Sequence, residues 1–81
     1  MGSLPTSYKA IEDIQKAIEE NDGNYWVVNP LKNCLRDIVT DAEYQEGIDT
    51  LNSLQEEYPN LLDYEKIIEL IKKAEKRYNA L

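Results

Sequence analysis

The sequence predicts an all-α fold, a small helical bundle of three main amphipathic helices plus a shorter one. Apolar residues recur at spacings of three and four along most of the chain, which is the period of a helix with one buried face. Only one short run has strand character, and no second strand is available to pair with it. Twenty Leu, Ile and Val residues, six Tyr and one Trp are enough for one core in 81 residues, so we expect a single domain over 1–81.

The first helix is predicted over about residues 7–21. Thr6 or Ser7 can cap its start, and Gly23 suits the left-handed conformation that follows many helix ends. Its apolar positions lie at helical spacing: Tyr8, Ile11, Ile14 and Ile18. The residues between them are mostly charged, which is typical of a solvated outer face.

Residues 24–29 form the most aromatic and β-branched run of the chain, and we interpret them as a connector that can include an extra helical turn. Trp26, with Val27 or Val28, is expected to cover one end of the core. The alternative is that Tyr25 and Trp26 form an exposed anchor for a partner, because aromatic residues often dominate binding energy. A short helix over about 30–39 should follow, with Asn29 as N-cap and Pro30 in the first turn.

The next helix, over about 41–58, is the one around which we expect the others to pack. Its apolar stripe is Tyr44, Ile48, Leu51, Leu54 and Tyr58. Thr40 with Glu43 matches a capping box, and Val39 with Tyr44 matches a hydrophobic staple, which favours a break before this helix. The absence of Gly and Pro between residues 31 and 46 instead favours one continuous helix over 30–58. Gly47, on the edge of the stripe, predicts a close helix crossing rather than a functional hinge.

The last helix, over about 61–79, has the clearest apolar periodicity, so we expect it in the middle of the bundle. Asn60 or Asp63 can cap it. Its polar face carries five basic residues against two acidic ones over residues 66–81. Basic residues late in a helix also complement the helix dipole, which accounts for most of this charge structurally.

Residues 37–65 contain nine acidic residues and no basic one. We identify the acidic side of the 41–58 helix, together with the exposed-anchor candidates, as the predicted partner-binding site: Glu43, Glu46, Asp49, Glu56, Glu57, Tyr25 and Trp26. Tyr44, Tyr58 and Tyr64 are interleaved with these acids and are expected to help anchor a contact. The simpler alternative is that the acids only keep a small bundle in solution.

The charge and the missing residue types exclude several other functions. A net charge of −7 and a pI near 4.4 argue against direct nucleic-acid binding and against anionic membranes. The chain has no histidine, no glycine-rich phosphate loop and one cysteine, Cys34, which we expect to be a small buried side chain. The acidic run 41–52 fails the calcium-loop pattern, because Gly47 is one place late. We therefore expect no catalytic residue, cofactor or metal, and not an enzyme.

The single cysteine and the absence of a signal-peptide pattern predict a cytoplasmic location, and no apolar run reaches the roughly 18 residues of a membrane span. Residues 1–5 are expected to be flexible or a remnant of an expression vector. Gly2 and Thr6 formally match the N-myristoylation pattern, but a single acyl chain would hold an acidic protein on a membrane only weakly.

These features favour a non-enzymatic protein-binding module that sets its acidic helix against a basic partner. An inhibitor, an immunity protein or an antitoxin-like regulator would have this character, since opposed potentials accelerate encounter. The alternative hypothesis is a structural or assembly subunit that self-associates or packs within a larger helical complex.

Overall fold

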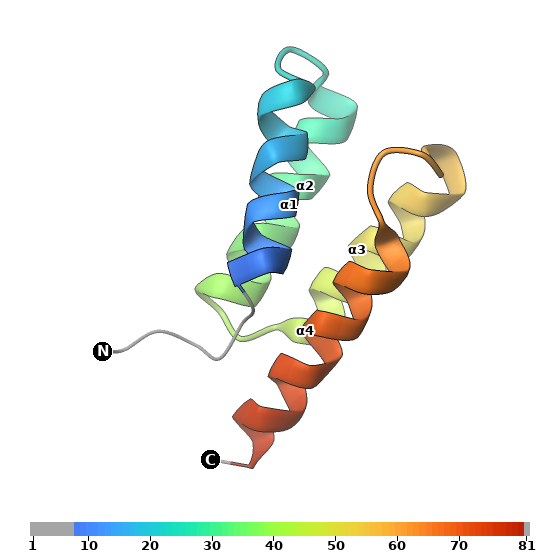
Figure 1. Ribbon diagram of the computed structural model, residues 1–81. Helices are drawn as coiled ribbons and strands as arrows, with labels where there is room; N and C mark the ends of the chain where they lie inside the picture. Colours follow the sequence, from blue (N-terminus) through green and yellow to red (C-terminus); the bar gives the residue numbers. More distant parts are fainter. Residues whose placement is uncertain (1–7, 81) are drawn as a thin grey trace.

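Four helices form a bundle in residues 8–80, the part of the chain that the computed structural model describes (Figure 1). They are α1 (Tyr8–Glu20), α2 (Tyr25–Val39), α3 (Tyr44–Glu57) and α4 (Tyr64–Asn79). Helices α1 and α2 form one hairpin, α3 and α4 form the other, and no strand occurs in the described residues. The all-α prediction is therefore confirmed. The predictions for residues 1–5 lie outside the described residues.

The two hairpins meet mainly through α2 and α3, which share the most extensive contact, and α4 packs on α3 and more lightly on α1. The expectation that the last helix lies in the middle of the bundle is wrong. Its apolar stripe is regular because one side of α4 is buried. All four helices contribute to one core: Ala10, Ile14, Ala17, Val27, Leu31, Cys34, Ile38, Tyr44, Ile48, Leu51, Leu54, Tyr64, Ile67, Ile71 and Ala74.

Helix α2 begins at Tyr25, so the predicted connector and the predicted helix start at Asn29-Pro30 are wrong. Asn24 occupies the N-cap position, and its carbonyl oxygen accepts hydrogen bonds from the amides of Val27 and Val28 at 3.0 and 2.8 Å. Both valines are buried, whereas Trp26 is exposed. Burial of the valines outweighs their preference for strands, and Pro30 lies inside the helix, where it cannot donate a hydrogen bond to the carbonyl four residues earlier.

A break separates α2 from α3. The sequence left open whether residues 30–58 form one helix or two, and the structure has two. The predicted capping box is nevertheless wrong. Thr40 ends α2, donating its amide hydrogen to the Arg36 carbonyl at 2.8 Å, and Ala42 takes a positive φ of 54° in the link. Glu43 is the N-cap of α3, without a capping hydrogen bond from its side chain.

Gly47 lies where α3 crosses α2, as its position in the sequence predicted. A Cβ atom there would stand 2.6 Å from Ile38 Cγ2 and 3.6 Å from the Cys34 carbonyl oxygen. The thiol of Cys34, which is fully buried, donates to the Gly47 carbonyl oxygen at 3.5 Å. The prediction that Cys34 is a small buried side chain is confirmed, and the residue lies beside Gly47 where α2 and α3 cross.

The turn between α3 and α4 is held by Tyr64, the first residue of α4, whose hydroxyl donates to the Tyr58 carbonyl oxygen at 2.7 Å. Helix α4 therefore begins three residues later than the predicted residue 61, and Asp63 is its N-cap without a side-chain capping bond. Leu61 and Leu62 of the turn are half-buried against the core. Within the described residues, no helix is long and apolar enough to cross a membrane.

Replacing Tyr64 by phenylalanine should lower the free energy of unfolding by about 1 kcal/mol, because the Tyr58 carbonyl at the end of α3 loses the shorter of its two hydrogen bonds and keeps the one from the Leu61 amide at 3.2 Å. Urea denaturation followed by circular dichroism measures this change. Tyr44→Phe is the matched control, since Tyr44 is equally buried but its hydroxyl has no hydrogen-bond partner among residues 8–80. That variant should be neutral or slightly stabilised, and equal losses in both variants would contradict the assigned role of the Tyr64 hydroxyl.

Candidate functional site

The acidic residues of α3 gather on one solvent-facing side of the helix. Glu46, Asp49, Glu56 and Glu57 are all exposed, and helical periodicity places them within an arc of about 100°, opposite the buried stripe. Glu43, also exposed, precedes them at the N-cap. We call Glu43, Glu46, Asp49, Glu56 and Glu57 the acidic face. The five acidic residues that the sequence predicted are therefore together.

None of these five carboxylates forms an ion pair within the described part of the chain. Lysine and arginine residues instead pair elsewhere, in Lys9–Asp13, Arg36–Asp41 and Lys73–Glu69. Within the acidic face, Asp49 accepts a hydrogen bond from Gln45 Nε2 at 2.9 Å, a neutral contact. Within the described residues, no lysine or arginine of α4 therefore lies at ion-pair distance from the acidic face.

The three tyrosines interleaved with the acids do not contribute to this surface. Tyr44 and Tyr64 are 2% exposed and Tyr58 is half-buried, because all three belong to the apolar stripes that form the core. The expectation that they anchor a partner is wrong. Helical spacing places Tyr44 and Tyr58 on the apolar stripe of α3, which packs against the core.

Tyr25 and Trp26 are exposed to 68% and 62%, so the interpretation that Trp26 covers the core is wrong and the anchor alternative is consistent with the exposure. The two residues lie on different flanks of α2. Helical spacing places Tyr25 with Lys32 and Arg36 on the side away from the core, whereas Trp26 lies with Pro30 on the flank toward α3. Tyr25 is therefore separate from the acidic face.

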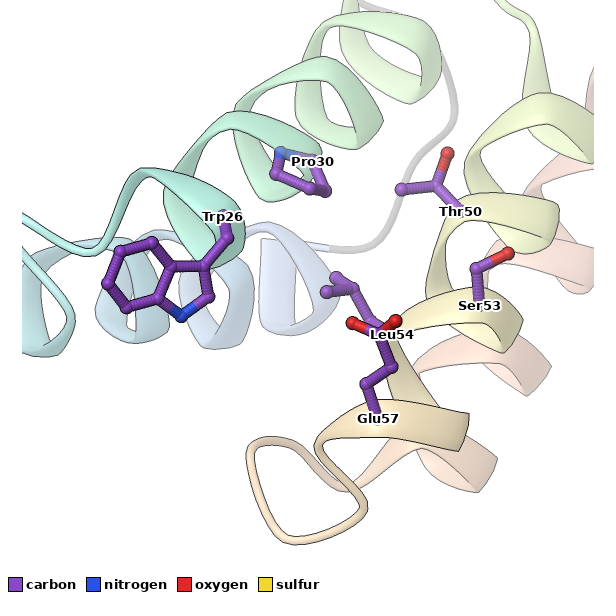
Figure 2. A pocket seen from close by; sticks show the side chains of 6 residues that line it. All are labelled: Trp26, Pro30, Thr50, Ser53, Leu54 and Glu57. Atoms are coloured by element: carbon purple, nitrogen blue, oxygen red, sulfur yellow. The ribbon is translucent and has the colours of Figure 1, made fainter.

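Trp26 and the acidic face meet at a hollow of about 250 Å³ between α2 and α3 (Figure 2). Trp26 projects from α2 on one side of the hollow, and Leu54 and Glu57 project from α3 on the other. Six residues line it: Trp26, Pro30, Thr50, Ser53, Leu54 and Glu57. Of the seven predicted site residues, Trp26 and Glu57 are thus brought together from separate helices.

Four lining residues of the hollow were not predicted from the sequence. One flank of α3 carries three of them, because Thr50, Ser53 and Leu54 follow Glu46 at helical spacing. The sequence does not say which flank of α3 meets α2, since that depends on how the two helices cross. Pro30 was assigned to a helix start, and its place on this wall follows only from the correct beginning of α2.

The hollow combines an apolar floor with polar groups at its rim. Leu54 is buried beneath the hollow, and Trp26 and Pro30 form an apolar wall on the side of α2. The Thr50 hydroxyl is already engaged, donating to the Glu46 carbonyl oxygen at 3.1 Å. Among the described residues that line the hollow, Glu57 is the one with a charged side chain. The volume of the hollow lies below the roughly 300–1,000 Å³ of typical small-molecule sites, so the hollow fits one side chain better than a cofactor.

Comparisons of the chain with protein-family models, with curated proteins and with solved structures found no match. Any inference about function therefore depends on the side chains that the fold brings together. Those are the unpaired carboxylates of α3 and the exposed indole beside them.

Proposed function

We propose that this protein is a non-enzymatic binding module whose acidic face docks on a basic surface of another protein. The observation that carries the proposal is that the face's five exposed carboxylates have no ion-pair partner within residues 8–80. Like charges on one helix repel one another and are tolerated at some loss of stability. A cationic partner would convert that repulsion into attraction and accelerate encounter.

An exposed aromatic residue beside the charges supports the same proposal. Trp26 adjoins Glu57 at the hollow, so the surface combines long-range steering with a large side chain able to make a short-range contact. A small, acidic inhibitor of a cationic enzyme, including one that acts on nucleic acid, fits this surface.

The test reverses three charges of the acidic face: Glu46→Lys, Asp49→Lys and Glu57→Lys. Each reversal adds two units, so the triple variant changes the net charge from −7 to −1. The matched control places the same reversals on the outer side of α1, at the exposed residues Glu12, Glu19 and Glu20. Both triple variants carry equal charge, so a general loss of solubility or of charge affects them alike.

We expect at least one basic protein to be captured from extract by the wild type and by the α1 control, and to be lost from the face variant. Exposed pairs contribute about 0.2–1 kcal/mol each, so three reversals should weaken capture by about tenfold or more, and added salt should weaken it too. Quantitative mass spectrometry measures the enrichment. If no protein shows this pattern, or if both triple variants lose it equally, the acidic face is not the binding surface.

A further inference from the structure

We propose that the hollow between α2 and α3 receives a single arginine side chain of the basic partner. The inference rests on the proposed function and names the group that the acidic face would recognise. The lining combines an exposed indole, a small apolar surface and one carboxylate. This is the combination that a guanidinium on an aliphatic stem complements.

The apolar part of the hollow suits the stem of the arginine. Arginine buries its methylene groups along apolar surface while its charged end stays at a polar rim. Leu54 and Pro30 offer such a surface, and Leu54 is only 4% exposed, so it forms a fixed floor. An acidic or neutral polar side chain would place its polar atoms against this floor without a partner.

The polar part suits the guanidinium. Its planar group stacks on aromatic rings and donates two parallel hydrogen bonds to a carboxylate, which an ammonium cannot do. Trp26 on α2 and Glu57 on α3 line opposite sides of the hollow, so a guanidinium seated between the two helices would lie between an aromatic residue and a carboxylate (Figure 2).

The acidic face around the hollow supplies the steering but not the specificity. Glu46, Asp49 and Glu56 share the face with Glu57 but do not line the hollow. They attract any cation equally, whereas only Glu57 lies where an inserted side chain would reach it. Glu56 and Glu57 therefore form a matched pair, adjacent and both exposed, with one outside the hollow and one in its lining.

The experiment titrates the full chain with three hexapeptide amides, of arginine, of lysine and of the uncharged analogue citrulline, at low salt. Trp26 is the only tryptophan, so its fluorescence reports events at the hollow directly. Calorimetry gives the affinity independently of the indole. Glu57→Gln and Glu56→Gln each remove one charge with little change of shape, and Trp26→Leu is compared with Tyr25→Leu, the neighbouring exposed aromatic.

We expect hexa-arginine to bind more tightly than hexa-lysine and to change the Trp26 fluorescence. Glu57→Gln should weaken the binding of hexa-arginine by about tenfold, whereas Glu56→Gln should weaken it by about twofold. Trp26→Leu should weaken it by about fivefold, with Tyr25→Leu near the wild type. Equal effects of the two glutamine variants, equal affinity for lysine, or unchanged fluorescence would overturn the arginine site while leaving the acidic face intact. Failure of both cationic peptides to bind more tightly than the citrulline peptide would overturn the acidic face as well.

Discussion

Replacing Gly47 by valine should lower the free energy of unfolding by about 3 kcal/mol or more, because the α2–α3 interface has no room for a side chain at this position. A Cβ there would stand 2.6 Å from Ile38 Cγ2 and 3.5 Å from Cys34 Sγ. The methyl of Ile38 is carried on a β-branched carbon, whose rotamer is nearly fixed in a helix, so it cannot swing away. Overpacking a well-packed core by even a few methyl groups costs about 1–3 kcal/mol.

Gly47→Ala separates the effect of packing from that of helix propensity. Alanine is favoured over glycine in a helix interior by about 0.8–1 kcal/mol, so an uncrowded site would become more stable. We expect instead that Gly47→Ala lowers the free energy of unfolding by about 1 kcal/mol, which urea denaturation measures. The loss should shrink in an Ile38→Leu background, where the crowding Cγ2 methyl is absent. Asn52→Val, on an exposed position of α3, is the control for valine in this helix and should change stability by less than about 0.5 kcal/mol. A Gly47→Ala variant more stable than the wild type would show that glycine does not set the spacing.

The helices of this fold could be predicted from the sequence because helical periodicity is local information. The buried stripe of α3 and the burial of Cys34 both follow from spacings of three and four. The close crossing at Gly47 was also predictable, because a glycine on the edge of an apolar stripe has few other roles in a helix interior.

The helix starts could not be predicted in the same way, because tertiary burial decided them against local preference. Val27 and Val28 favour a strand locally, yet they fill the core as the first turn of α2. Thr40 with Glu43 matched a capping box, but α2 ends at Thr40. The link through Ala42 follows, and α3 begins only at Tyr44. Short capping patterns recur by chance, and only the packed arrangement selects among them.

The candidate site was predicted in its charges but not in its shape. The acidic face follows from the sequence, since all its members lie within one unbroken acidic window. The hollow does not, because it depends on which flank of α2 turns toward α3 and on the true start of α2. Once α2 begins at Tyr25, helical spacing puts Trp26 on the wall and Tyr25 outside it.

Alkaline pH should destabilise the protein steeply between pH 9 and 12, through the buried thiol of Cys34. Burial, followed by the negative charge of Asp37, raises the pKa of this thiol from 9.0 to about 12. The folded state therefore keeps a proton that the unfolded state releases above pH 9. Because the unfolded state then binds fewer protons, the free energy of unfolding falls as pH rises, by about 1.4 kcal/mol per pH unit and by roughly 4 kcal/mol over the interval. Below pH 9 this group adds no pH dependence.

Cys34→Ala isolates the contribution of the thiol. The variant loses the hydrogen bond to the Gly47 carbonyl and a little packing, so its stability at neutral pH should be about 1 kcal/mol lower. Its stability should nevertheless fall less steeply above pH 9, so that the free energies of unfolding of wild type and variant become equal near about pH 10 and then exchange order. Tyr64, whose pKa burial also raises, contributes a decline in stability above pH 10 that both proteins share. Urea denaturation at unit steps of pH from 7 to 11 measures both curves. Parallel curves would mean that the thiol does not carry the alkaline instability. A steeper curve for the wild type alone would assign the alkaline instability to the thiol buried at the α2–α3 crossing.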